Sequence, residues 1–267
     1  MLKDITLGQY FPGDTVVHRL DPRTKIVSVI LYIVALFSAK SWIGFGIILF
    51  ALAISVILSR ITPKTIFKGM KPLLIIIVFT AVLNGFFTPG DPIFKVWVFQ
   101  LTRQGVERAA LMILRLVMLI TGTLLLTYTT SPIALTDGLE SLLNPLKKLH
   151  LPIHELAMMM SIALRFIPTL IEETDKIMSA QKARGADFET GSLTEKAKAL
   201  MPLLVPLFVS AFRRADELAV AMESRCYHGD SGRTRMKQLT MHAADWVTLA
   251  LFVLLVAATV VVKRLGM

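Results

Sequence analysis

Four long stretches of this sequence are almost free of charge. They contain two charged side chains, Lys40 and Arg115, although the 267-residue chain has 29 Lys and Arg and 19 Asp and Glu in all. A soluble domain spreads charge over its surface, whereas apolar stretches of about 17–25 residues are typical of membrane-spanning helices. The sequence therefore predicts an all-α polytopic membrane protein. The four stretches are residues 26–59, 72–90, 109–136 and 246–262.

The excess of positive charge needs a different explanation from nucleic-acid binding. The formal net charge is +10, but 54% of the residues are hydrophobic. That combination favours cationic loops at an anionic membrane face, so no nucleic-acid partner is expected. The single cysteine, Cys226, can form no internal bridge, which excludes a disulfide scaffold.

The apolar stretches divide into about five transmembrane helices. Lys40-Ser41-Trp42 interrupts the longest stretch and makes its two halves a tight hairpin. Residues 1–130 then hold an N-terminal segment and four spans, and residues 244–267 hold the last one. The expected spans are residues 26–38, 42–58, 72–87, 106–126 and 245–262.

The loop between the second and third spans sets the orientation. It contains four basic residues and no acidic one, and cytoplasmic loops are rich in Lys and Arg. This loop and the N-terminus are therefore expected in the cytoplasm, although Lys263-Arg264 at the opposite end fits less well. The basic residues are Arg60, Lys64, Lys68 and Lys71.

Arg115 lies inside the fourth span, where a charged side chain costs a few kcal/mol. We expect it to make a polar contact that orders the helix bundle or reaches a partner. The alternative is that its long side chain extends to the outer interface.

Residues 131–243 form a segment too long for a simple loop. A first helix from Ser131-Pro132 to about Pro145 has one apolar face and is expected at the membrane surface. Two long helices follow, at about 153–184 and 192–225. The first is apolar in its first half and the second in its middle, and both are charged near their ends. The segment is predicted to be a cytoplasmic coupling module with its apolar parts against the spans; two further spans are the alternative.

An internal repeat joins the charged ends of the two long helices. Residues 173–185 align with residues 214–226 at an offset of 41. An arginine in the last turn of a helix ordinarily complements the helix dipole. Two matched copies favour another reading, in which small residues allow close approach and each guanidinium enters an acidic groove on one of two similar partners. The aligned pairs are Asp175 with Asp216, Ala180 with Ala221, and Arg184 with Arg225.

Several kinds of chemistry are missing from the sequence. It has no phosphate-binding P-loop, no H-E-x-x-H motif and no nucleophile elbow. His150 and His154 are four residues apart, but Pro152 breaks the helix between them, so no metal site is expected. The four charge-poor stretches contain no acidic residue that could relay protons. We expect a non-catalytic protein without a cofactor.

Short motifs along nearly the whole chain resemble the T component of energy-coupling factor vitamin transporters, their transmembrane coupling subunit. The N-terminal ones are Gly8-Gln9-Tyr10, Pro12-Gly13-Asp14 and the run His18 to Lys25, which includes Asp21 and Arg23. The later ones run from Ala163 to Pro168, with Arg165, from Ala180 to Gly185, and from Ala221 to Tyr227.

The resemblance implies partners and sites. It implies a prokaryotic plasma-membrane subunit bound to two ABC-type ATPases and to one small substrate-binding membrane protein, the S component. Two triplets would seat in the ATPases, and the second departs from the usual Ala-Arg-Gly pattern at both flanks. The N-terminal motifs look more like the type that serves several S components. The triplets are Ala183-Arg184-Gly185 and Ser224-Arg225-Cys226.

Two other classes remain open at this point. A conventional ABC importer permease would also bind ATPases, with one coupling loop in each subunit. A membrane adaptor would bind partners without moving a solute. The sequence does not name the vitamin, because substrate specificity in the resembled family would lie in the S component.

Overall fold

The computed structural model divides the chain into two compact units, each considered by itself. The bundle unit comprises residues 8–139 and 239–267, and the arm unit comprises residues 1–7 and 140–238. The structure describes residues 10–89, 92–96, 99–149, 151–186, 188, 192–227, 229 and 238–265. The expected division at residues 131 and 243 stays a prediction.

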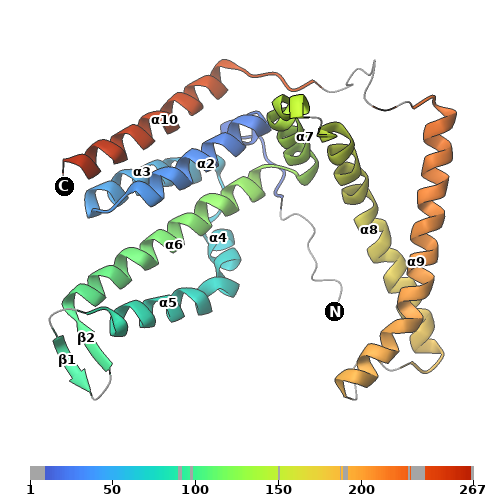
Figure 1. The fold of residues 1–267 in the computed structure, drawn as a ribbon, viewed down its shortest axis with the longest axis horizontal. Coiled ribbons are helices and arrows are strands. Elements are labelled where there is room, and N and C mark those ends of the chain that lie inside the picture. Colours follow the sequence, from blue (N-terminus) through green and yellow to red (C-terminus); the bar gives the residue numbers. More distant parts are fainter. Residues whose placement is uncertain are drawn as a thin grey trace. The chain divides into compact units, whose positions relative to one another are not determined.

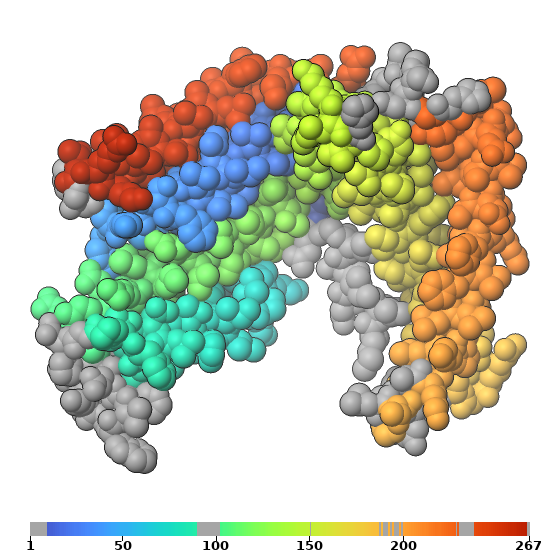
Figure 2. Space-filling model, in the orientation of Figure 1, coloured from blue at the N-terminus to red at the C-terminus, as the bar shows by residue number. Residues whose placement is uncertain are grey.

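Helices that are distant in sequence pack together in the bundle unit. α10 lies against α2, α5 lies against α6, and α2 and α3 both contact α6 (Figures 1 and 2). The helices of this unit are α1 (Val16–Arg19), α2 (Pro22–Ser38), α3 (Trp42–Ser59), α4 (Pro63–Met70), α5 (Leu74–Phe87), α6 (Arg103–Thr129), most of α7 (Pro132–Leu143) and α10 (Ala243–Arg264).

The core of the bundle unit lies between α2, α3 and α6. Leu36, Phe45, Ile48 and Met118 are almost completely buried there. Tyr32 of α2 donates from its hydroxyl to the Met118 carbonyl oxygen of α6 at 2.9 Å. This bond joins the two helices and satisfies a buried hydroxyl, which would otherwise be costly away from water.

Polar residues mark where the apolar helices begin. Asp21 caps α2 and is followed by Pro22, a residue favoured at the first helical position. Ser41 caps α3 by accepting from the Gly44 N–H at 3.3 Å. The Lys40-Ser41-Trp42 break predicted from the sequence therefore separates α2 from α3, as expected.

Two features between the expected spans were not foreseen. The basic loop contains α4 and a 3₁₀ turn at Lys71–Leu73, directly before α5. Strands β1 (Pro92–Val96) and β2 (Phe99–Thr102) form an antiparallel hairpin between α5 and α6, with an irregular register between Pro92 and Phe94. The other secondary-structure elements that the structure describes in the bundle unit are helices, as the charge pattern predicts.

Five helical segments in the described part of the chain are long and apolar enough to cross a membrane. α2 is not among them; its 17 residues extend about 25 Å. α8 is among them, so the alternative that the 131–243 segment contains a further span is retained for this helix. The five are Trp42–Ser59, Pro63–Phe87, Arg103–Thr129, Ile153–Ala183 and Ala243–Arg264.

The arm unit is built on two long helices, α8 (Ile153–Ala183) and α9 (Leu193–Ser224), which pack against each other. A 3₁₀ segment, Asn144–Leu149, precedes them. α8 contains Pro168, and α9 contains Pro202 and Pro206. The expected helices at about 153–184 and 192–225 are thus confirmed to within a residue at each end.

Close contact between α5 and α6 depends on Gly105. A Cβ atom at this position would lie 2.6 Å from the Gly85 carbonyl oxygen and 3.1 Å from that of Asn84. Backbone atoms cannot move aside as a flexible side chain can. We expect Gly105→Ala to lower the free energy of unfolding by about 1–3 kcal/mol, as overpacking does.

Thermal unfolding in detergent measures this effect. Gly46→Ala in α3 is the matched control, because a Cβ there meets nothing within 4 Å. Gly46→Ala is expected to leave the free energy of unfolding unchanged or to raise it by up to about 1 kcal/mol, because alanine has a higher helix propensity than glycine. Equal melting temperatures for the two variants would contradict the close approach of α5 and α6.

Candidate functional site

The ends of α8 and α9 have the same hydrogen-bond pattern. At the end of α8, the Gly185 N–H donates to Lys182 O at 3.0 Å and the Ala186 N–H donates to Gln181 O at 3.0 Å. At the end of α9, the corresponding bonds run from Cys226 N to Glu223 O at 2.9 Å and from Tyr227 N to Met222 O at 3.1 Å. Both are Schellman caps, and every donor and acceptor is shifted by the offset of the sequence repeat.

The residue after each arginine is in the left-handed region. Gly185 has φ of +88° and Cys226 has φ of +56°. Glycine adopts this conformation freely, whereas a residue with a Cβ is strained by about 1–2 kcal/mol. Cys226 therefore adopts the left-handed conformation that glycine adopts in the first cap, despite its side chain. The sequence alone did not decide this.

Replacing Cys226 by glycine should relieve this strain. We expect Cys226→Gly to stabilise the end of α9 by about 1 kcal/mol, whereas Cys226→Val should destabilise it, because a β-branched residue fits φ > 0 poorly. Hydrogen exchange of the last turn of α9 reports both changes. Faster exchange in the glycine variant would contradict the assigned cap.

The side chains at both caps face outward from the arm unit. Arg184 and Arg225, with the small residues on either side, are exposed. Ala180 and Ala221, four residues earlier in each helix, are exposed as well, and so is Asp216, whereas Asp175 is half-buried. Small neighbours leave each guanidinium accessible to a planar bidentate acceptor such as a carboxylate.

A contact between α8 and α9 relates the two caps to each other. Arg214 Nη2 lies 2.9 Å from Glu173 Oε2, and these two positions correspond in the 41-residue repeat. Arg184 follows Glu173 by 11 residues, and Arg225 follows Arg214 by 11 residues. Each separation corresponds to about 16 Å of helix. Further along the pair, Gln181 Nε2 donates to Pro202 O at 3.4 Å, so the helices run antiparallel.

Because the helices run in opposite directions, α8 and α9 end at opposite ends of the pair (Figure 1), and Arg184 and Arg225 follow those helix ends. Two equivalent motifs at equal distances from one crossing point suit two equivalent partners related by an approximate twofold axis. The repeat is visible in the sequence, whereas the Glu173–Arg214 contact at its centre is not.

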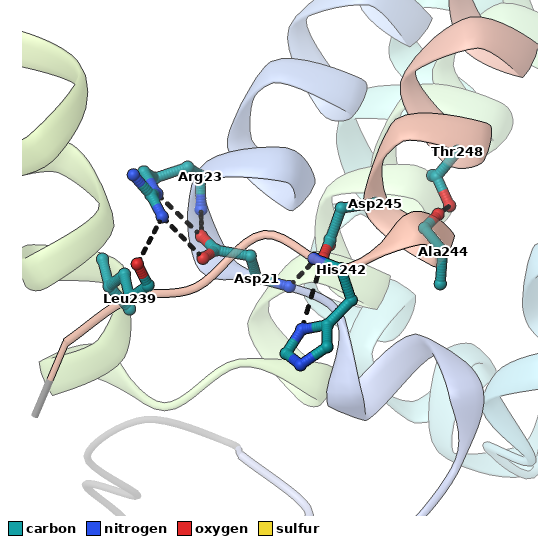
Figure 3. A network of polar contacts seen from close by, with 7 residues as sticks. All are labelled: Asp21, Arg23, Leu239, His242, Ala244, Asp245 and Thr248. Carbon is teal, nitrogen blue, oxygen red and sulfur yellow. Dashed lines mark hydrogen bonds and ion pairs between the residues drawn. The ribbon is translucent and has the colours of Figure 1, made fainter.

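A second cluster, which includes two residues predicted from the sequence, lies in the bundle unit (Figure 3). Asp21 Oδ2 is 3.0 Å from Arg23 Nη2, and the same Arg23 nitrogen donates to Leu239 O at 2.9 Å. The Asp21 N–H donates to Asp245 Oδ1 at 2.8 Å, and the His242 N–H donates to Asp245 Oδ2 at 2.8 Å. We call these five residues the return latch, because they hold the chain where it enters α10.

The return latch joins residues more than 200 positions apart. Asp21 is 6% exposed and Asp245 is 1% exposed, so both carboxylates depend on these bonds. Asp21 and Arg23 were predicted from the sequence, whereas Leu239, His242 and Asp245 were not. The one available signal was an acidic residue in the first turn of an apolar helix, where it complements the dipole.

The N-terminal motif is held against the end of α6. The Phe11 N–H donates to Tyr128 O at 3.0 Å, and the two rings meet edge to face at 5.3 Å. His18 Nε2 lies 3.1 Å from Phe11 O, and burial lowers the pKa of His18. The neutral ring then donates from Nε2 and accepts from Thr15 Oγ1 at 2.7 Å through Nδ1.

Arg115 contacts protein within the bundle unit. Its Nη2 donates to Ala39 O at 3.0 Å, at the end of α2, and its guanidinium lies 5.3 Å from the Phe45 ring centre. Arg165 of α8 is exposed. His154 Nδ1 lies 2.9 Å from Glu140 Oε1, and His150 is outside the described residues. No group of three metal-ligating side chains occurs among the residues that the structure describes.

These features define a class of protein: a multi-pass helical membrane protein with a separate arm that presents two matched arginine caps. Comparison with known proteins identifies the family. A family model described as cobalt transport protein matches residues 13–237.

Curated relatives match almost end to end. The energy-coupling factor transporter transmembrane protein EcfT of Clostridium kluyveri is 58% identical over 250 residues, covering 92% of each chain. The EcfT proteins of Thermosediminibacter oceani and Bacillus subtilis are 57% and 49% identical, covering 91% and 96% of this chain and 92% and 97% of their own. The chain belongs to the family of energy-coupling factor transporter transmembrane proteins, and it is a transporter membrane subunit rather than a catalytic enzyme.

Proposed function

We propose that this chain couples two ABC-type ATPases to an S component during uptake of a vitamin or micronutrient. The observation that supports the proposal most directly is the pair of identical caps. Each presents an exposed arginine between small residues, and the two lie at equal distances from the Glu173–Arg214 contact. Two equivalent grooves, one on each ATPase, fit this arrangement.

In this mechanism the arm unit works as a lever. ATP binding and hydrolysis occur in the partners and change the spacing of their two grooves. The arginine caps follow this movement because each guanidinium is held by charge-assisted hydrogen bonds. α8 and α9 are continuous helices of 31 and 32 residues, so motion at the caps would displace their apolar parts. Those parts would alter the surface that holds the S component and release the vitamin inward.

The proposal includes an orientation. The basic residues around α4 support a cytoplasmic position for that end of the bundle unit, together with the N-terminus. Residues 131–243 then form the cytoplasmic coupling module, in the plasma membrane of a prokaryote. The relatives are bacterial proteins, and the N-terminal motifs support a subunit that serves several S components in turn.

The subunit ratio of the native complex tests this function. The tagged chain, purified from native membranes in mild detergent, should bring down two ATPase subunits and one S component per chain. Two copies of this chain per complex would indicate a conventional permease instead. The same complex in liposomes with trapped ATP should accumulate a labelled vitamin, and ATP hydrolysis without accumulation would favour an adaptor.

A further inference from the structure

An apolar cleft of about 430 Å³ runs along the bundle unit between α1, α2, α3, α6 and α10. Its walls include Ile47, Leu125, Phe252 and Leu255. At its edge, Phe50 and Leu254 are 69% and 65% exposed, so the opening is apolar too. In a membrane such an opening faces acyl chains rather than water.

Three of the five polar or charged residues that line the cleft lie at one end of it; the other two, Ser55 and Thr248, donate from their hydroxyls within their own helices. Lys25 and Ser28, one turn apart near the start of α2, line it together with Thr129 at the end of α6. The Lys25 ammonium donates to His18 O at 3.1 Å and to Thr129 O at 2.9 Å, which fixes a positive charge at this end. The remaining lining is almost entirely apolar.

Ser28 is the observation that points to a ligand. It is 4% exposed, it lines the cleft, and its hydroxyl has no hydrogen-bond partner among the described residues. A buried hydroxyl without a partner costs about 1–3 kcal/mol, so a native structure normally supplies an acceptor. The Ser28 Oγ is shielded from water in this conformation, so the side chain would rotate about χ1 to meet an acceptor that enters the cleft beside Lys25.

We propose that the cleft binds one membrane phospholipid, with an acyl chain along the apolar walls and an ester carbonyl oxygen accepting from Ser28. The Lys25 charge complements the phosphate beyond the ester. The cleft length also fits: the α3 residues that line it, Ile47 to Leu58, extend over about 16 Å.

The apolar opening favours an acyl chain over a protein segment as the occupant of the cleft. An acyl chain is much narrower than a helix and enters from the membrane without breaking backbone hydrogen bonds. The lipid would fill the space between α3 and α10 and hold the two helices at a fixed separation.

A pair of neighbouring alanines in α10 provides the test. Ala258 lines the cleft, and Ala257 is exposed and lies outside its lining. The full chain and its Ala258→Trp, Ala257→Trp and Ser28→Ala variants are extracted from phosphatidylglycerol nanodiscs and examined by native mass spectrometry. Melting temperatures identify any variant that fails to fold.

We expect the parent chain and Ala257→Trp to retain one phosphatidylglycerol each. Ala258→Trp should retain at least tenfold less at the same detergent concentration, and Ser28→Ala three- to tenfold less, the effect of one lost hydrogen bond. Equal retention by the two tryptophan variants overturns the proposal, as does an adduct with the mass of the detergent.

Crosslinking identifies the occupant in the assembled transporter. A photoreactive phenylalanine at Ile54, which lines the cleft and is 42% exposed, should capture a phospholipid in native membranes. Capture of a polypeptide there overturns the proposal. Ala258→Trp serves as the control, because it should abolish the lipid adduct in the same complex.

Discussion

The Arg184→Glu, Arg225→Glu double variant is expected to lose ATPase co-purification and vitamin uptake while still inserting into the membrane. Each substitution replaces an exposed guanidinium with a carboxylate at a cap that we propose faces an acidic groove. Truncating one partner of such a pair costs about 2–5 kcal/mol at an interface, a factor of roughly 30 or more in affinity. Reversing the charge adds repulsion.

Single variants and matched controls separate this effect from a general change of charge. Arg184→Glu or Arg225→Glu alone should weaken ATPase attachment at least tenfold, because each removes one of two contacts. Lys176→Glu in α8 and Arg213→Glu in α9 reverse equally exposed charges away from the caps. Their co-purification should stay within about twofold of the parent, since exposed surface charges contribute little.

Arginine-to-lysine substitution sharpens the same test. Arg184→Lys and Arg225→Lys keep the charge but lose the planar fork that binds a carboxylate through two parallel bonds. We expect intermediate attachment for the lysine variants. Parent-like ATPase binding and uptake in the double glutamate variant would exclude the caps as the coupling contacts.

The second large effect is expected at the return latch. Asp245→Ala removes the acceptor for two backbone N–H groups, those of Asp21 and His242, both at 2.8 Å. Each buried donor left without a partner costs about 1–3 kcal/mol, so the free energy of unfolding should fall by about 2–6 kcal/mol. Asp245→Asn keeps one acceptor oxygen and should lose about half as much.

Thermal unfolding of the purified chain in detergent measures this loss. Thr248→Ala, one turn further along α10, is the control, because its hydroxyl only donates back to Ala244 O within the same helix (Figure 3). It should change stability by less than about 0.5 kcal/mol. If Asp245→Ala and Thr248→Ala have the same melting temperature, the return latch does not hold α10 to the start of α2.

Local patterns in the sequence predict most of the helices. Charge-poor stretches give α2, α3, α5, α6 and α10, because a bilayer excludes charge over the length of a span. The break at Lys40-Ser41-Trp42 is visible because serine caps the next helix. The hairpin β1–β2 was missed, since its two short strands are stabilised by pairing rather than by a periodic apolar face.

The candidate site was predicted only in part. The 41-residue repeat aligns Arg184 with Arg225, but the left-handed backbone of Cys226 could not be derived from a residue that disfavours it. Contacts such as Asp21 with Asp245 and Glu173 with Arg214 join distant positions, and no local pattern specifies them. The unpartnered hydroxyl of Ser28 likewise emerges only from three-dimensional packing.

The native thiol at the second cap offers the most direct measurement of the coupling contact. Cys226 is the only cysteine in the chain, it is exposed, and it follows Arg225. Its rate of maleimide labelling should fall at least tenfold in the complex with both ATPases, compared with the chain alone. Ala183→Cys in a Cys226→Gly background should report the same protection at the first cap. Labelling rates that are equal in the free chain and in the complex would contradict the account.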